Sequence, residues 1–336
     1  CMHSFRGSDM RNFIKHAACG IAFFAGLALL LTAASWVMVP KDNGRDDGMQ
    51  DPMANGILSE PKNTIDVLIM GDSETYCSMI PLKIWEDHGI TTYCCGTPAQ
   101  KLFYSQELLQ KVFKRQSPKI VILETNAIFR QFSCGDILLR KAGAIFPVFN
   151  YNDRWKSLKS HDLRFSIKYT HVDNTKGYLY GTKVDEASTD GYMKETEEIA
   201  PIPPQNREYV ESIKACCKEN GAKLILLSTP STMNWNMARH NSIKKLAKEL
   251  HLKYIDMNLM QKQIPIDWKK DTRDKGDHLN HYGAEKVTTY LGGYLSDTGL
   301  LHNHREDRDY DRWNDALKIF NNTLSDPAPK RCEGKS

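Results

Sequence analysis

The chain has 336 residues, and its 41% apolar content is enough to bury one large α/β core or two small ones, which excludes an intrinsically disordered protein. Its 45 basic and 41 acidic residues are interspersed and give a formal charge of +4, without a basic block of the kind that binds nucleic acid. We therefore expect one main domain with appendages, and no nucleic acid as a partner.

An apolar run over residues 17–39 is as long as the roughly 20 residues that a helix needs to cross a bilayer. Three basic residues precede it with little acid nearby: Arg6, Arg11 and Lys15. By the positive-inside rule, residues 1–16 are then cytoplasmic and the main domain is extracytoplasmic. The run exceeds the about 7–15 apolar residues of a secretory signal, which favours an uncleaved signal anchor in the cell membrane. The small residues 32–35 keep cleavage open as the alternative.

Residues 40–63 are rich in Asp, Gly, Asn and Pro, which predicts a flexible extracytoplasmic linker. Beyond it, short apolar runs typical of buried parallel strands lie at 65–70, 91–95, 119–124, 223–228 and 253–256. Patterns typical of amphipathic helices lie at 99–115, 206–219, 237–250 and 281–296. This alternation predicts an α/β domain over residues 64–300, a three-layer α/β/α sandwich with a parallel five-stranded sheet, preceded by one N-terminal transmembrane helix.

Two segments fall outside this alternation. Residues 127–222, between the third and fourth strands, far exceed the roughly 10–12 residues of a crossover and form an insertion. Its aromatic residues and charged stretch fit a cap over the strand ends and a plain surface excursion equally well. Residues 301–336 form a charged tail whose helical spacing of apolar residues predicts an amphipathic helix docked on the domain, with Tyr310, Trp313, Leu317 and Phe320.

A serine follows the first predicted strand directly, in Gly71-Asp72-Ser73. Ligand sites of parallel sheets lie at the carboxyl ends of strands, although a serine there can also cap a helix. Far along the chain, His278 lies in a polar turn with two acids, Asp274 and Asp277. A serine hydroxyl needs a base to accept its proton, and that imidazole needs a carboxylate to fix its tautomer. The chain thus contains the parts of a Ser-His-Asp site, with Ser73 as nucleophile and His278 as base.

Four sequence blocks in this order resemble the SGNH/GDSL hydrolase superfamily. The tripeptide ending in Ser73 is similar to its nucleophile block, Gly96 to its glycine block, and Asn126 to its asparagine block; the segment around His278 is similar to its final block. The resemblance implies an oxyanion site made by the backbone N–H groups of Ser73 and Gly96 and by the Asn126 amide. Taken singly, Gly96 reads as a turn glycine and Asn126 as a strand-end cap.

The final block departs from the family pattern, because Lys275 stands three positions before the histidine, where an Asp is usual. Asp274 is favoured as the orienting acid, and Asp277 stays open. The asparagine block reads Glu-Thr-Asn where Gly-x-Asn-Asp is usual. These departures resemble a subgroup similar to the teichoic acid D-alanine transfer protein and alginate O-acetylation proteins. The resemblance implies acyl chemistry on a cell-surface polysaccharide, with a membrane-bound O-acyltransferase as a partner.

A polar and aromatic cluster after the fourth strand is predicted to line the mouth of the site. Asn234, Trp235 and His240 are expected to contact substrate together with Asp72, with Trp235 stacking on a sugar ring. A helix-capping loop with a half-buried Trp is the alternative. His240 is a poorer base than His278, because no acid lies close to it in the sequence.

The predicted chemistry needs no cofactor, and no metal site is expected. The nine cysteines lack zinc-site spacing, as do His302 and His304 in the charged tail. The expected function is an extracytoplasmic serine esterase or O-acyltransferase that acts on acyl esters of a cell-surface polysaccharide. The competing interpretation is a non-catalytic glycan-binding or scaffold protein of an envelope-modifying complex.

Overall fold

The structure is a computed structural model that describes residues 2–325, with side chains from residue 10 onward. The side chain of Arg6 and residues 326–336 of the predicted tail lie outside the described residues. The chain divides into two compact units. Unit 1 contains residues 1–49 and 132–168, and unit 2 contains residues 50–131 and 169–336, as far as each is described.

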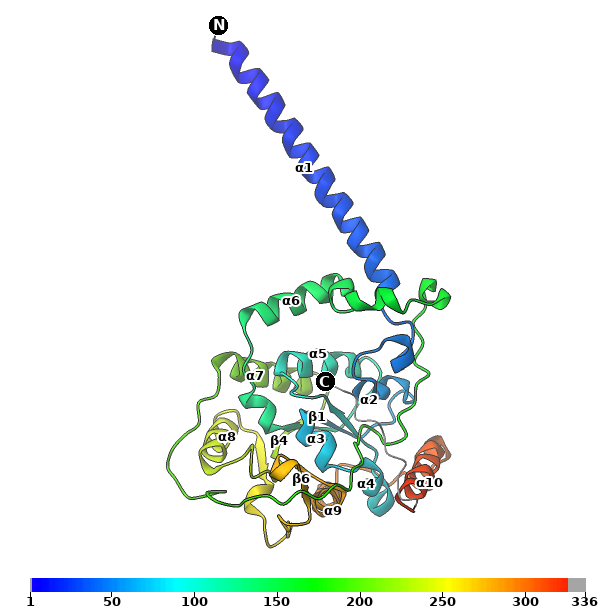
Figure 1. Cartoon of the computed structure of the whole chain (residues 1–336), viewed down its shortest axis with the longest axis vertical. Helices are drawn as coiled ribbons and strands as arrows, with labels where there is room; N and C mark the ends of the chain where they lie inside the picture. The colour runs from blue at the N-terminus through cyan, green and yellow to red at the C-terminus, as the bar shows by residue number, and fades with distance from the viewer. Residues whose placement is uncertain (1, 326–336) are drawn as a thin grey trace. The chain divides into compact units, whose positions relative to one another are not determined.

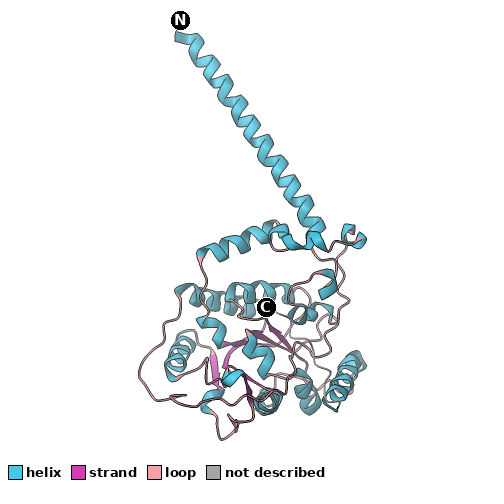
Figure 2. Cartoon of the chain, viewed as in Figure 1, coloured by secondary structure: helices cyan, strands magenta, loops and turns pink. Residues whose placement is uncertain are grey.

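Unit 2 is built on five parallel strands in the order β2-β1-β3-β4-β5. Figure 2 shows the strands of this sheet in magenta among the surrounding helices. The strands are β1 (Val67–Gly71), β2 (Thr92–Gly96), β3 (Ile120–Glu124), β4 (Lys223–Ser228) and β5 (Lys253–Asp256). Gly71 is in register with Gly96 at the carboxyl end of the sheet. All five runs start and end within two residues of their predicted bounds, and the predicted α/β class is confirmed.

Helices cover both faces of this sheet, because successive strand residues point to opposite sides. Leu68 and Met70 of β1 belong to one apolar cluster, and Val67 and Ile69 belong to the other. The first cluster includes side chains of α5 (Leu102–Phe113), α7 (Pro204–Glu219) and α8 (Met237–Glu249). The second includes side chains of α4 (Pro81–His88) and α9 (His281–Asp297). The result is the predicted three-layer sandwich.

A last helix, α10 (Asp311–Ser325), packs on unit 2 through an apolar stripe. Of the four residues from which the sequence predicted an amphipathic helix, Trp313 and Phe320 are buried and Tyr310 and Leu317 are partly buried against the first cluster; Ala316 is buried as well. The Trp313 ring lies 5.6 Å from the ring of Trp85, and the Lys176 ammonium lies 4.9 Å from the Trp313 ring. The helix therefore closes the edge of the first apolar cluster.

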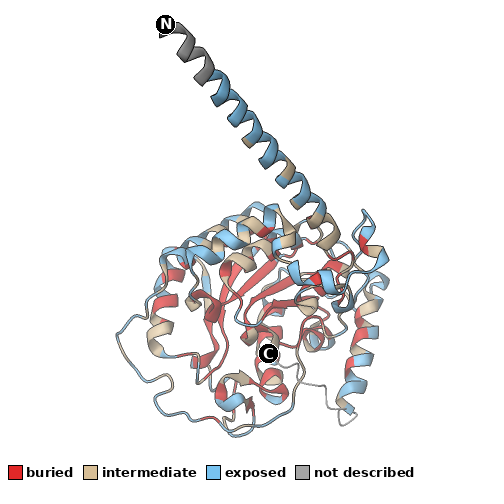
Figure 3. Cartoon of the chain, turned by 45° about the horizontal axis from the view of Figure 1, so that its top comes forward, coloured by how far each residue is buried: buried red, intermediate tan, exposed pale blue. Residues whose placement is uncertain are grey.

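Unit 1 begins with one long helix, α1 (Met2–Met38), which contains most of the predicted anchor. Its part Met10–Met38 is long and apolar enough to cross a membrane, and its side chains are largely exposed (Figure 3). The second segment of the unit contains α6 (Cys134–Ile145) and gathers around the carboxyl end of α1 (Figure 1).

The flexible linker predicted over 40–63 is wrong in its second half. Residues 52–59 form α2 (Pro52–Asn55) and a 3₁₀ turn, and they bury Ala54 and Ile57 in the first apolar cluster. The Tyr93 hydroxyl of β2 donates to the carbonyl of Met53 at 2.9 Å. Composition suggested a linker because turn-forming residues dominate it, but the few apolar side chains share one face and pack beside β2.

The insertion at 127–222 is divided between the two units and ends in α7. Residues 132–168 belong to unit 1, and residues 169–203, here called the strap, run along unit 2 without regular helix or strand. Backbone bonds hold the strap at several elements: Lys176 O accepts from Cys94 N, and Gly181 O accepts from His281 N. It is therefore neither a single cap nor a loose excursion, and it borders the elements that carry the predicted site.

Ile57→Ala is expected to lower the free energy of unfolding by about 2–5 kcal/mol, because Ile57 is 1% exposed and its removal leaves a cavity. Thermal unfolding of the full chain in detergent measures the effect. Lys62→Ala, at an exposed position nearby, is the control and should change nothing. If both substitutions left the free energy of unfolding unchanged, the prediction of a flexible linker would be correct after all.

Candidate active site

Ser73 is the first residue of α3 (Ser73–Ser78), which begins directly after β1. Asp72 caps this helix, because its Oδ1 accepts from the backbone N–H of Glu74 at 3.1 Å. The strand order reverses direction between β1 and β3, the position at which parallel sheets of this order form their ligand sites. The carboxyl end of β1 therefore holds Ser73 at the expected edge of the sheet.

His278 is carried to this edge by a small antiparallel hairpin. β6 (Thr272–Arg273) pairs with β7 (His278–Leu279), and the turn between them contains three successive left-handed residues, Asp274, Lys275 and Gly276, with φ of 56°, 57° and 92°. A left-handed conformation is uncommon for residues other than glycine. This tight turn folds back on itself and brings the carboxylate of Asp274 to the imidazole of His278.

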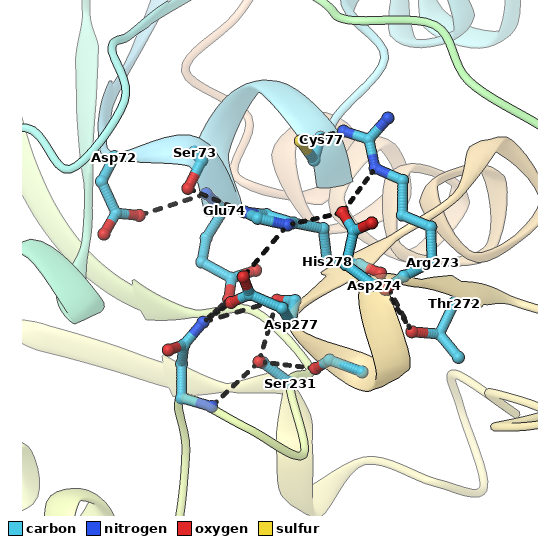
Figure 4. Close-up of polar contacts among 12 residues, drawn as sticks. Asp72, Ser73, Glu74, Cys77, Ser231, Thr272, Arg273, Asp274, Asp277 and His278 are labelled. Atoms are coloured by element: carbon cyan, nitrogen blue, oxygen red, sulfur yellow. Dashed lines mark hydrogen bonds and ion pairs between the residues drawn. The ribbon is translucent and has the colours of Figure 1, made fainter. Parts of the chain in front are cut away.

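The expected meeting of Ser73 and His278 is found (Figure 4). Ser73 Oγ lies 2.8 Å from His278 Nε2 although 205 positions separate the two residues. On the other side of the ring, Nδ1 lies 3.3 Å from Asp274 Oδ2 and 3.5 Å from Asp277 Oδ2. The favoured Asp274 is the nearer acid. A neutral imidazole with its proton on Nδ1 would donate to this carboxylate and accept the Ser73 proton at Nε2.

Asp277 also accepts a short hydrogen bond from outside its turn, whereas the further partners of Asp274, the cations of Lys183 and Arg273, lie at 3.8 and 3.9 Å. Asp277 Oδ1 accepts from Asn234 Nδ2 at 2.6 Å, and the same nitrogen donates to Glu74 Oε1 at 2.7 Å. Asn234 was predicted to contact substrate, but its amide instead links the turn of His278 to the helix of Ser73. The link holds the two halves of the site together across the sheet edge.

Three carboxyl groups are buried beneath Ser73, and two of them were not recognised from the sequence. Asp72, Glu74 and Glu124 are each at most 1% exposed. Burial raises the pKa of Glu74 well above its ordinary value, and the nearby charges of Glu124 and Asp72 raise it further. Burial, with the charge of Asp72, likewise raises the pKa of Glu124. A Glu directly after an apolar strand run, as in Leu123-Glu124, is the signal that could have revealed one of them.

Two arginines, also not recognised from the sequence, face these acids. Arg130 donates from Nε and Nη2 to Asp72 Oδ2 at 2.8 and 2.7 Å. Arg239 donates from Nη1 to the Asn126 side-chain oxygen at 2.8 Å, and burial together with the positive charge of Arg130 lowers the pKa of Arg239. The positive guanidinium groups offset the negative charge of the buried carboxyl groups. A buried carboxylate without a partner would be strongly destabilising.

The predicted substrate contacts of Trp235 and His240 are wrong. The Trp235 side chain is 3% exposed and lies in the first apolar cluster. Its Nε1 donates to Asp256 Oδ2 at 3.0 Å, and His240 Nδ1 lies 2.7 Å from the same oxygen. Both side chains turn inward because Asp256, at the end of β5, satisfies their polar atoms. The alternative of a helix-capping loop is correct, because the Asn236 side chain caps α8, but its tryptophan is fully buried and not half-buried.

Asp72 was also expected to contact substrate, and this is wrong for a similar reason. Its side chain is fully buried, and Oδ2 accepts from Asn126 Nδ2 at 2.9 Å in addition to its arginine partner. These bonds fix the Asn126 amide beside the turn that carries Ser73. Asp72 is thus a structural acid of the site and has no exposed surface for a ligand.

Gly96 lies against the same turn. A Cβ built at Gly96 would come within 2.8 Å of the Asp72 carbonyl oxygen and 3.1 Å of the Tyr76 ring. Only glycine therefore lets the end of β2 approach the Ser73 turn this closely. The roles of Gly96 and Asn126 toward an oxyanion stay predictions.

Among the described residues, no group of three or more His, Cys, Asp and Glu side chains is arranged to hold a metal ion. In the tail, the His304 ring stacks on the Tyr310 ring with centroids 4.1 Å apart.

Comparison with known proteins gives a likeness of fold alone. No family model and no curated protein matches the chain. Similar solved structures include a lipase/acylhydrolase from Enterococcus faecalis (13% identity, 71% of this chain and 98% of that chain, TM-score 0.38). A GDSL-like lipase from Bacteroides thetaiotaomicron is also similar (12% identity, 69% of this chain and 88% of that chain, TM-score 0.34). So is an acetyl xylan esterase (12% identity, 69% of this chain and 98% of that chain, TM-score 0.36).

Glu74→Gln is expected to stabilise the chain at alkaline pH and to leave its stability unchanged near pH 4. Because the folded-state pKa of Glu74 is raised, the unfolded chain loses this proton first, and stability falls as pH rises from about 4.3 toward the raised pKa. Gln has the shape of the protonated acid and keeps an acceptor for Asn234, but it does not titrate.

Thermal unfolding of both proteins from pH 4 to 9 measures the difference in Tm. Each kcal/mol of stability gained by the substitution should raise Tm by roughly 2–4 °C. Glu186→Gln, at an exposed position of the strap, is the matched control and should show no such difference. A Glu74→Gln effect of equal size at every pH would contradict the titration.

Proposed function

We propose that the chain is a membrane-anchored, extracytoplasmic serine esterase or O-acyltransferase with Ser73 as nucleophile, His278 as base and Asp274 as the orienting acid. The observation that supports it best is the 2.8 Å contact between Ser73 Oγ and His278 Nε2, with Asp274 at 3.3 Å from the opposite ring nitrogen. A nucleophile within reach of a base that is itself oriented by an acid is the arrangement of serine acyl chemistry.

In the first half-reaction, Ser73 Oγ attacks the carbonyl carbon of an ester while its proton moves to His278 Nε2. The new C–O bond forms as the carbonyl electron pair moves to oxygen, and Asp274 stabilises the imidazolium. The oxyanion then reforms the carbonyl, the bond to the alcohol breaks, and Nε2 returns the proton to the leaving oxygen. The products are a free alcohol and an acyl ester of Ser73.

The negative oxygen of the intermediate needs donors that are already in position. We assign this role to the backbone N–H groups of Ser73 and Gly96 and to the side-chain amide of Asn126. Asn126 Nδ2 has two N–H groups, of which Asp72 accepts one. The close packing of Gly96 beneath the Ser73 turn is consistent with this assignment.

In the second half-reaction, His278 Nε2 takes the proton of an incoming hydroxyl, whose oxygen attacks the acyl carbon; the bond to Ser73 Oγ then breaks, and Nε2 returns the proton to Ser73. Water as the acceptor makes the protein an esterase, and a glycan hydroxyl makes it a transferase. Attachment through α1 would hold the enzyme beside the cell envelope, which favours acyl groups of a cell-surface polysaccharide as the substrate. A membrane-bound O-acyltransferase is the partner that the subgroup resemblance implies.

Ser73→Ala is expected to abolish labelling of the full chain by a fluorophosphonate and to reduce p-nitrophenyl acetate hydrolysis about 10³-fold or more, because the attacking oxygen is lost. Gel fluorescence and absorbance measure the two effects. Ser188→Ala, an exposed serine of the strap, is the control and should label like the wild type. A folded wild-type chain that neither labels nor hydrolyses ester would instead support the glycan-binding or scaffold function.

Asp274→Asn is expected to lower kcat/KM by about 10²–10⁴-fold, because an amide no longer stabilises the imidazolium or fixes its tautomer. Asp277→Asn is the matched comparison and should cost less than about tenfold, since its carboxylate lies farther from Nδ1 and is shared with Asn234. Steady-state kinetics of ester hydrolysis give both values. The opposite order would make Asp277 the orienting acid.

A further inference from the structure

The second segment of unit 1, residues 132–168, exposes an unusual share of large apolar side chains. Nine of them are at least 40% exposed: Leu138, Leu139, Ile145, Phe149, Trp155, Leu158, Leu163, Phe165 and Ile167. The described part of unit 2 is several times longer and exposes only seven. Such a density of exposed apolar side chains marks a surface that is covered by a partner. In α6 itself, the only buried residue is Gly143.

The same segment is basic. It contains seven Lys and Arg residues against three Asp and no Glu. A hollow of about 110 Å³ beside the end of α1 is lined by Lys41, Arg164 and Lys168, by Asp42 and Ser166, and by His161, which pairs with Asp47 at 2.8 Å. Basic side chains near an anionic membrane surface each contribute about 1 kcal/mol of attraction. The charge of the segment is therefore complementary to phosphate headgroups.

Contacts within unit 1 hold this segment at the carboxyl end of α1. Val148 N donates to Ser35 Oγ at 3.1 Å, and the Phe165 ring stacks on Trp36 with centroids 4.8 Å apart. The backbone N–H of Lys168 donates to the carbonyl of Lys41 at 2.8 Å. If α1 crosses a bilayer, these contacts keep the segment at the depth at which the helix leaves it. Tryptophan side chains are enriched at that depth.

We propose that residues 132–168 form a membrane-interface surface that binds lipids with anionic headgroups in the leaflet at which α1 ends. The exposed apolar side chains enter the boundary between headgroups and acyl chains, and the exposed Lys and Arg side chains pair with lipid phosphates, whereas the buried Arg154 pairs with Asp162 within the segment. The chain is then attached to the membrane at two places, by the span and by this surface. The inference rests on the side chains of unit 1 and stands or falls independently of the activity of Ser73.

Fluorescence quenching of Trp155, which is 63% exposed on this surface, tests the inference. The full chain is reconstituted in nanodiscs of phosphatidylcholine and phosphatidylglycerol, with or without bromine on the acyl chains. The difference between wild type and Trp155→Phe isolates the signal of Trp155. We expect bromine to remove at least half of that signal and aqueous iodide to have little effect. The signal of Trp268, in unit 2, is isolated by Trp268→Phe and should not respond to bromine.

A double substitution tests whether the exposed apolar side chains themselves contact lipid or the surface only lies near the nanodisc. Leu139→Asp together with Leu163→Asp alters two exposed positions, so folding should persist, and bromine quenching of Trp155 should fall at least twofold. Val184→Asp, at an exposed position of unit 2, is the matched control and should change nothing. Quenching of Trp155 by iodide, or protection from both iodide and bromine, would overturn the inference in favour of water or of a protein partner.

Discussion

Every feature of the site depends on the parallel direction of five strands in the order 2-1-3-4-5. Parallel strands end at one edge, and the reversal of connection between β1 and β3 leaves their carboxyl ends adjacent and open to the two loops that follow. Ser73 follows β1, and Asn126 follows β3. The hairpin of His278 then needs only to reach this edge. The separation of 205 positions between nucleophile and base is therefore bridged by sheet geometry.

A buried polar network beneath this edge makes the geometry rigid. Asp72 accepts bonds from Asn126, from Arg130 and from the backbone of Glu74, so one carboxylate connects the turn after β1 with the segment after β3. Asn234 adds the connection to the turn of His278. A network of this kind is favourable only while each member is satisfied, because buried charges without partners are costly. The residues of the buried network must therefore balance one another's charges, whereas Ser73 and His278 must lie within hydrogen-bond distance of each other.

The side chains proposed for catalysis and those proposed for membrane attachment lie in different units of the protein. Unit 2 contains the sheet and the side chains proposed for acyl chemistry, and unit 1 contains the apolar helix and the exposed apolar and basic segment. If the proposed acyl chemistry acts on envelope polymers, its substrate lies near the membrane. Attachment by both a span and a surface would restrict the motion of the protein to that region and raise the local concentration of substrate.

The sequence alone determined the class of fold, because the apolar periods of buried strands and amphipathic helices are local properties of the chain. It also predicted that Ser73 and His278 meet and favoured Asp274 over Asp277 as the nearer acid, since each stands in a recognisable local block. The tertiary structure decided which polar side chains turn inward. Trp235 and His240 are buried because Asp256, at the end of β5, meets them, and that meeting depends on how the loop before α8 and α8 itself pack against the sheet. Neither composition nor spacing encodes such a contact.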